Sequence, residues 1–273
     1  MDSSPAPDPV PPADLVEVAP PPRGPWSFWA TLGFGLLAMG VMVAAQAIVG
    51  IVFAVTTMAQ QYGRHGRNAI DPDRIAQELA SNPLMLAIAM FVSLPAVGLA
   101  LWLMIHLRRG PGLLDYLGLR GFRVSQFIFW AVVLTGVVYG GEWFLKRAGD
   151  RSGQQFMADL LAQGSHLPML ITAVVLGAPL LEEFLFRGFM YRGMAVRRHS
   201  VWLAILIPNL LWTLLHVQYQ PATMAVLFCM GLVFGCARHF SGSTMLAVLL
   251  HALSNALGTI STMVELQEKV AAP

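Results

Sequence analysis

Charged side chains are scarce in this sequence. Only 12% of its 273 residues are Asp, Glu, Lys or Arg, and 56% are hydrophobic, whereas an average soluble domain has about 25% charged residues. A soluble fold of this size would have too few polar side chains to cover its surface. The formal net charge of +2 is too small to favour a nucleic-acid partner. The composition therefore predicts an integral membrane protein whose surroundings are the lipid bilayer.

Cysteine is nearly absent as well. Cys229 and Cys236 are the only two. They lie in one apolar run and, seven residues apart, share a helix face. This predicts two small buried thiols rather than a disulfide or a metal site.

Several catalytic patterns are also missing. The sequence has no H-E-x-x-H helix of a zinc protease, no G-x-S-G nucleophile and no P-loop or dinucleotide fingerprint. It has no pair of aspartates within an apolar run. These absences exclude the commonest hydrolase and nucleotide-binding signatures.

The apolar runs predict an all-α, polytopic membrane bundle. Each is about long enough to cross a bilayer. The seven predicted spans cover 27–59, 83–107, 124–145, 167–190, 200–217, 221–238 and 243–262. A less apolar segment around 154–166 would make an eighth element. The helical domain takes residues 26–264, between a disordered Pro-rich tail at 1–25 and a short polar tail at 265–273.

Basic residues are distributed unevenly between the loops. With seven spans, the basic loops 108–123 and 192–199 lie on the same side as the N-terminus. The positive-inside rule then predicts a cytoplasmic N-terminus, in the inner (plasma) membrane of a bacterium. The asymmetry is modest, because loops 60–81 and 146–166 carry three basic residues each.

Few strongly polar side chains remain at membrane depth, and nearly all fall on the fourth, fifth and seventh predicted spans. They are Glu182, Glu183, Arg187, Asn209, His216, His251 and Asn255, with Gln46 in the first span. Ionisable residues inside a span are costly and usually mark a functional site.

The spacing separates the two adjacent glutamates. Glu183 and Arg187 are i,i+4 neighbours and can pair on one helix face. Glu182 is turned away by about 100°, so it need not do the same job. The alternative is that Glu183 and Arg187 form a buried pair that only locks helices together.

Two further i,i+4 pairs lie on the other spans, His251 with Asn255 and Trp212 with His216. One carboxylate and two imidazoles suit hydrolysis, because a glutamate can take a proton from water. A histidine and an amide can donate to the oxyanion that forms on a carbonyl. Glu182, His216 and His251 would equally suit a zinc ion.

Three motifs in this order resemble a known family. Residues 182–187, E-E-F-L-F-R, match the E-E-x-x-x-R motif of the CPBP family of CAAX proteases and bacteriocin-processing (Abi) enzymes. Residues 212–216 match its F-x-x-x-H motif with Trp in place of Phe, and residues 251–255 match H-x-x-x-N. The resemblance covers a protease core at 167–262.

The resemblance implies an intramembrane endopeptidase related to type II CAAX prenyl proteases, acting on a peptide or protein substrate at the membrane. Carried over by position, Glu182 would activate water with help from His216. His251 and Asn255 would stabilise the oxyanion.

The same resemblance assigns supporting roles to Glu183, Arg187 and Trp212, the last shaping the pocket. Members of the family are often labelled metalloproteases. We expect a mechanism without metal or other cofactor, with zinc on Glu182, His216 and His251 as the alternative.

Two other functions are compatible with the pattern. A non-catalytic scaffold or bacteriocin-immunity protein could keep the same fold, although it would not need all four catalytic-type residues. A proton-coupled transporter would also use membrane carboxylates and histidines, but the sequence shows no internal repeat.

The depth of the two histidines poses a geometric difficulty. At about 1.5 Å per helical residue, straight helices would place His216 deeper than His251. Tilts, or helix breaks at Pro179 and Pro208, are expected to bring them to one level.

Overall fold

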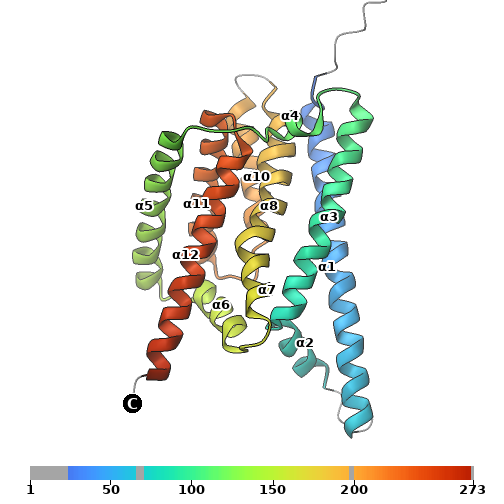
Figure 1. Cartoon of the computed structure of the whole chain (residues 1–273), viewed down its shortest axis with the longest axis vertical. Coiled ribbons are helices and arrows are strands. Elements are labelled where there is room, and N and C mark those ends of the chain that lie inside the picture. The colour runs from blue at the N-terminus through green and yellow to red at the C-terminus, as the bar shows by residue number, and fades with distance from the viewer. Residues whose placement is uncertain (1–23, 66–70, 197–199, 272–273) are drawn as a thin grey trace, which may run out of the picture.

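A computed structural model describes residues 24–65, 71–196 and 200–271, and within these ranges the chain forms helices and no strand (Figure 1). The predicted tail at 1–25 lies almost entirely outside the described residues. So do Arg67, Arg197 and Arg198, three of the loop arginines.

The helices follow one another through short connections. In order they are α1 Phe28–His65, α2 Pro72–Ala80, α3 Pro83–Arg108, α4 Leu113–Leu117, α5 Val124–Ala148, α6 Ser152–Ala162, α7 Leu167–Thr172, η2 Ala173–Gly177, α8 Ala178–Glu183, η3 Phe184–Met190, α9 Tyr191–Met194, α10 Val201–Leu214, α11 Pro221–Ser241 and α12 Thr244–Ala271. Six segments among the described residues are long and apolar enough to cross a membrane, and α10 is a shorter apolar helix. The predicted helical membrane bundle is confirmed.

Several elements differ in extent from those expected. Helix α10 has only 14 residues, because the chain turns over residues 215–219 before Pro221 begins α11. Helix α12 continues to Ala271, through most of the segment expected to be a polar tail. The candidate eighth element is the 11-residue helix α6, which is too short to span a bilayer.

The expected break at Pro179 is absent. Residues 167–194 form one continuous helical segment, in which η2 and η3 are π-helical and flank α8. Proline has no N–H to donate and its ring crowds the preceding turn. The wider π-helical turn before Pro179 accommodates it, so the helix continues and carries both glutamates into the bundle.

The segment 167–194 runs through the middle of the bundle (Figure 1). Helices α1 and α3 pack side by side on one flank, and α5, α11 and α12 pack on the other. The short α4 lies at the end where α1 begins, whereas α2 and α6 lie at the opposite end. We call these the α4 end and the α6 end.

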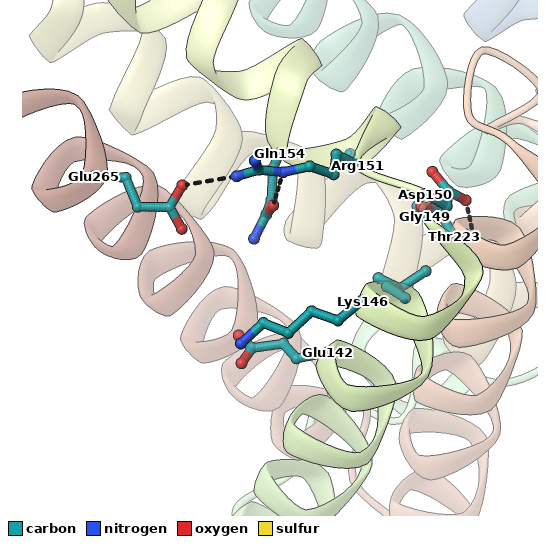
Figure 2. Close-up of a pocket in the computed structure, with 10 residues that line it drawn as sticks. Glu142, Lys146, Gly149, Asp150, Arg151, Gln154, Thr223 and Glu265 are labelled. Atoms are coloured by element: carbon teal, nitrogen blue, oxygen red, sulfur yellow. Dashed lines mark hydrogen bonds and ion pairs between the residues drawn. The ribbon is translucent and has the colours of Figure 1, made fainter. Parts of the chain in front are cut away.

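At the α6 end, a buried carboxylate joins the start of α6 to the start of α11. Asp150 Oδ2 accepts from the backbone N–H of Thr223 in the first turn of α11 at 2.7 Å (Figure 2). Its Oδ1 accepts from the N–H and hydroxyl of Ser152 at 2.9 and 2.7 Å. Burial alone would raise the pKa of Asp150, but these hydrogen bonds to its charged form outweigh burial and lower the pKa below its ordinary value of 3.8. Asp150 thereby caps α11 and ties it to the start of α6.

We expect Asp150→Asn to lower the free energy of unfolding by about 1–3 kcal/mol at neutral pH, because an amide nitrogen would face backbone donors. A carboxylate with a lowered folded-state pKa stabilises above its unfolded pKa, and this contribution is lost as pH falls through the folded pKa. The difference from wild type should therefore shrink below about pH 3.8. Thermal unfolding of both proteins in detergent at several pH values measures this difference in stability.

Asp159→Asn is the matched control, because Asp159 is an exposed carboxylate on α6. It should unfold like wild type. Equal stability of the Asp150 and Asp159 variants at neutral pH would refute the capping role of Asp150.

Candidate active site

A cavity of about 520 Å³ extends from the middle of the bundle toward the α6 end. Glu182 from α8, Trp212 and His216 from α10 and its following turn, and His251 and Asn255 from α12 all line it. Its other walls come from α1, α3, α6 and α11. Side chains far apart in the sequence thus share one space inside an apolar bundle.

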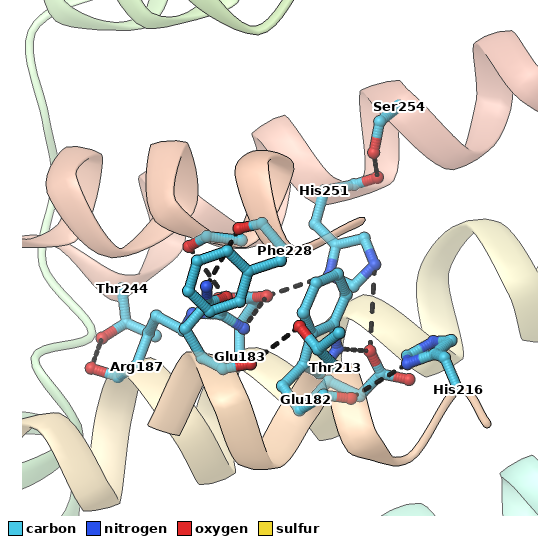
Figure 3. A network of polar contacts seen from close by, with 12 residues as sticks. Glu182, Glu183, Arg187, Thr213, His216, Phe228, Thr244, His251 and Ser254 are labelled. Atoms are coloured by element: carbon cyan, nitrogen blue, oxygen red, sulfur yellow. Dashed lines mark hydrogen bonds and ion pairs between the residues drawn. The ribbon is translucent and has the colours of Figure 1, made fainter. Parts of the chain in front are cut away.

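Glu183 does not share this space. Its side chain is fully buried, and Oε1 accepts from Arg187 Nη1 at 3.0 Å and from His251 Nδ1 at 2.9 Å (Figure 3). Its Oε2 is buried without a partner among the described residues. The predicted i,i+4 pair is present, and it also holds the ring of His251 on α12.

Arg187 is the centre of a larger set of contacts. Its Nη2 donates to Asn209 Oδ1 on α10 at 3.1 Å and to the carbonyl of Gly231 on α11 at 3.0 Å. The guanidinium carbon lies 5.0 Å from the ring centre of Trp212 and 5.7 Å from that of Phe234. Since burying an unpaired charge costs several kcal/mol, these partners are what allows the cation to sit inside the bundle.

Glu182 has a different environment, with 13% of its side chain exposed. Its Oε2 accepts from the indole N–H of Trp212 at 2.5 Å and lies 3.9 Å from His251 Nε2. Its Oε1 has no partner among the described residues and is not one of their buried, unpaired atoms. One oxygen is therefore held and the other is open to the cavity.

His216 lies beside Glu182 on the cavity wall. Its Nδ1 is 3.0 Å from the carbonyl oxygen of Trp212. A carbonyl can only accept, so Nδ1 carries the proton and a neutral ring leaves Nε2 as an acceptor. The Trp212 ring centre lies 5.0 Å from that of His216 and 5.6 Å from that of His251, so both imidazole rings lie against the same indole.

Asn255 lies on α12, one turn after His251, and also lines the cavity. Its Nδ2 donates to the carbonyl of Val174, in the π-helical η2, at 2.9 Å. An amide nitrogen has two N–H groups, and the second remains for a ligand in the cavity. The bond to Val174 fixes the amide against the same helical segment that carries Glu182.

The comparison with protein families agrees with this geometry. Residues 164–257 match the family described as type II CAAX prenyl endopeptidase Rce1-like. This segment is an Rce1-like domain. The resemblance to CPBP proteases is thus confirmed, and the domain belongs to a family of membrane proteases. It contains all four residues with proposed catalytic roles.

The chain is also similar to a bacterial protein. An "Uncharacterized 24.3 kDa protein" of Escherichia coli is 38% identical over 135 residues, which cover 48% of this chain and 62% of the relative. No solved structure matches.

The alternative to a metal-free mechanism is a zinc ion bound by Glu182, His216 and His251. Among the described residues, no group of three or more His, Cys, Asp or Glu side chains is placed to hold a metal ion. Glu182 Oε2 and His251 Nε2 lie 3.9 Å apart, and the atoms left free on the other expected ligands are Glu182 Oε1 and His216 Nε2. The side chains of Glu182, His216 and His251, as they stand among the described residues, are not grouped to hold one zinc ion.

Sequence reasoning missed several supporting groups. Asn209 stood out as a polar residue in an apolar run, but nothing in the sequence pointed to the carbonyl of Gly231. Arg238 was not singled out from the sequence, yet it is 5% exposed and its Nε donates to the carbonyl of Arg187 at 3.1 Å. The hydroxyl of Thr244 contacts that same carbonyl. These contacts close the α4 end above the site.

We expect Gly231→Ala to disrupt the setting of Arg187. A Cβ at Gly231 would overlap Asn209 Oδ1 and come within 2.9 Å of Arg187 Nη2. Overpacking of this kind costs about 1–3 kcal/mol, so the midpoint of thermal unfolding in detergent should fall by several degrees.

The control is Gly140→Ala in α5, where a Cβ would meet nothing within 4 Å. Alanine there should be neutral or slightly stabilising, since it favours helix over glycine by up to about 1 kcal/mol. Equal stability of the two variants would contradict the close approach at Gly231.

Proposed function

We propose that this protein is an intramembrane endopeptidase in which Glu182 activates a water molecule that attacks a peptide bond. The observation that carries this proposal is the division between the glutamates. Glu183 is buried and engaged by Arg187 and His251, whereas Glu182 opens to a cavity lined also by His216 and Asn255. The Rce1-like domain supports peptide-bond hydrolysis as the class of reaction.

In the proposed mechanism, Glu182 Oε1 takes a proton from water as the water oxygen attacks the carbonyl carbon. The free Nε2 of His216 orients this water. The oxyanion of the tetrahedral intermediate accepts from the second N–H of Asn255 and from His251 Nε2 when that ring is protonated. The carbon–nitrogen bond then breaks, and Glu182 returns its proton to the leaving amine.

His251 is placed to carry a positive charge when the oxyanion forms. Its Nδ1 faces the carboxylate of Glu183 at 2.9 Å, and its Nε2 faces that of Glu182 at 3.9 Å. With Arg187 as a second cation beside the two carboxylates, a protonated His251 makes the cluster neutral. We propose that Glu182 activates the water without a metal.

We expect Glu182→Ala and His216→Ala to lower the rate of cleavage by roughly 10²- to 10⁴-fold while the protein stays folded. Purified protein is assayed against membrane peptides with and without a prenyl group, and thermal unfolding is measured on the same samples. A sample of wild type treated with a strong chelator should keep its activity.

Glu142→Ala is the control, because Glu142 lies near the end of α5 in a neighbouring pocket (Figure 2) and does not line the cavity that contains Glu182. It should cleave like wild type. Equal cleavage by wild type and the Glu182 variant would overturn the protease mechanism. No cleavage by any sample would favour a scaffold or immunity protein, and loss of activity with a chelated metal would overturn the metal-free mechanism.

We further propose that the N-terminus is cytoplasmic, in a bacterial inner membrane. The α4 end carries Arg108, Arg109, Arg120 and Arg123 against Asp115 alone, whereas the α6 end mixes both signs. In this orientation the cavity, which reaches α6, extends toward the outer face of the membrane.

Single cysteines test this orientation in intact cells, in a background where both native cysteines are replaced by alanine. A membrane-impermeant maleimide should label Ser165→Cys, exposed at the α6 end, and not Ser125→Cys, exposed at the start of α5. The reverse labelling would refute the orientation.

A further inference from the structure

Trp212 contacts both groups assigned to water activation. Its indole N–H donates to Glu182 Oε2, and its backbone carbonyl accepts from His216 Nδ1 at 3.0 Å. A phenylalanine, the residue of the resembled F-x-x-x-H motif, would retain the carbonyl but has no N–H. This chain thus has a hydrogen bond to its glutamate that the motif's usual residue cannot supply.

The indole ring is fixed in place. It is 1% exposed, with the guanidinium of Arg187 5.0 Å from the ring centre. The rings of His251 and Phe234 meet it in edge-on geometry, at centroid distances of 5.6 and 6.1 Å. A donor held on several sides directs its N–H at one point, so the hydrogen bond restrains Glu182 and not the reverse.

We propose that Trp212 is the positioning residue of the water-activating pair. The two carboxylate oxygens of Glu182 are chemically equivalent until one is bound. Binding Oε2 through the indole leaves Oε1 as the oxygen that faces the cavity, and the Trp212 carbonyl sets the tautomer of His216 that leaves Nε2 free. This inference rests on the proposed function, because Glu182 and His216 act together only in that mechanism.

The kinetic test is Trp212→Phe, which keeps an aromatic ring beside Arg187 and removes the N–H. A misplacement of about 1 Å in a catalytic group can lower the rate by about 100-fold. We expect kcat to fall by that factor with KM changed less than about twofold, since a misplaced base affects the transition state and not substrate binding.

Trp202→Phe is the matched control, because Trp202 lies at the start of the same helix and is 62% exposed. It should leave kcat and KM at their wild-type values. An unchanged kcat in Trp212→Phe would overturn the positioning role, and so would a rise in KM with kcat unchanged.

A spectroscopic test is independent of activity. In protein labelled with ¹⁵N-tryptophan, each of the seven tryptophans gives one indole N–H signal, and the signal of Trp212 is the one absent from Trp212→Phe. We expect Glu182→Ala to move this signal upfield, because the N–H loses its carboxylate acceptor. Glu142→Ala should leave it in place.

An unmoved signal would overturn the hydrogen bond and with it the inference. If the signal moves but Glu182→Ala still cleaves peptides, the mechanism of the proposed function fails, and the positioning role fails with it although the bond is real. A moved signal together with the loss of kcat in Trp212→Phe supports the inference.

Discussion

The guanidinium of Arg187 imposes the constraint on which the site depends. A cation inside an apolar bundle is stable only with its hydrogen bonds made and its charge balanced. Glu183 supplies the negative charge that balances Arg187. Asn209 Oδ1 and the carbonyl of Gly231 accept the hydrogen bonds from Arg187 Nη2. These partners belong to three different helices, α8, α10 and α11. Moving any of these helices away would leave the buried cation without a partner, so Arg187 keeps them together.

That arrangement determines what each neighbouring glutamate can do. Glu183 is committed to Arg187 and to the ring of His251, so His251 is carried to the edge of the cavity. Glu182, turned to the other face of the helix, meets Trp212 and keeps one oxygen open. Contacts of Arg238 with the Arg187 carbonyl close the α4 end, and the cavity continues toward α6.

Much of this could be predicted from periodicity and spacing. Long apolar runs predicted the bundle, and i,i+4 spacing predicted the pair of Glu183 with Arg187, because both are local properties of a helix. The carbonyl of Gly231 could not be predicted, since it depends on how closely α11 approaches α10 in space. The continuous helix through Pro179 was also missed, because the π-helical turn that accommodates it has no marked sequence signal.

The central claim is that Glu182 activates water and does not itself attack the substrate. Single-turnover cleavage in H₂¹⁸O, with enzyme in excess over peptide, tests it directly. Water attack predicts one ¹⁸O in the new carboxylate of the product and none in Glu182, as read by mass spectrometry of both. An unlabelled product with ¹⁸O in Glu182 would show a covalent glutamyl intermediate and contradict the claim.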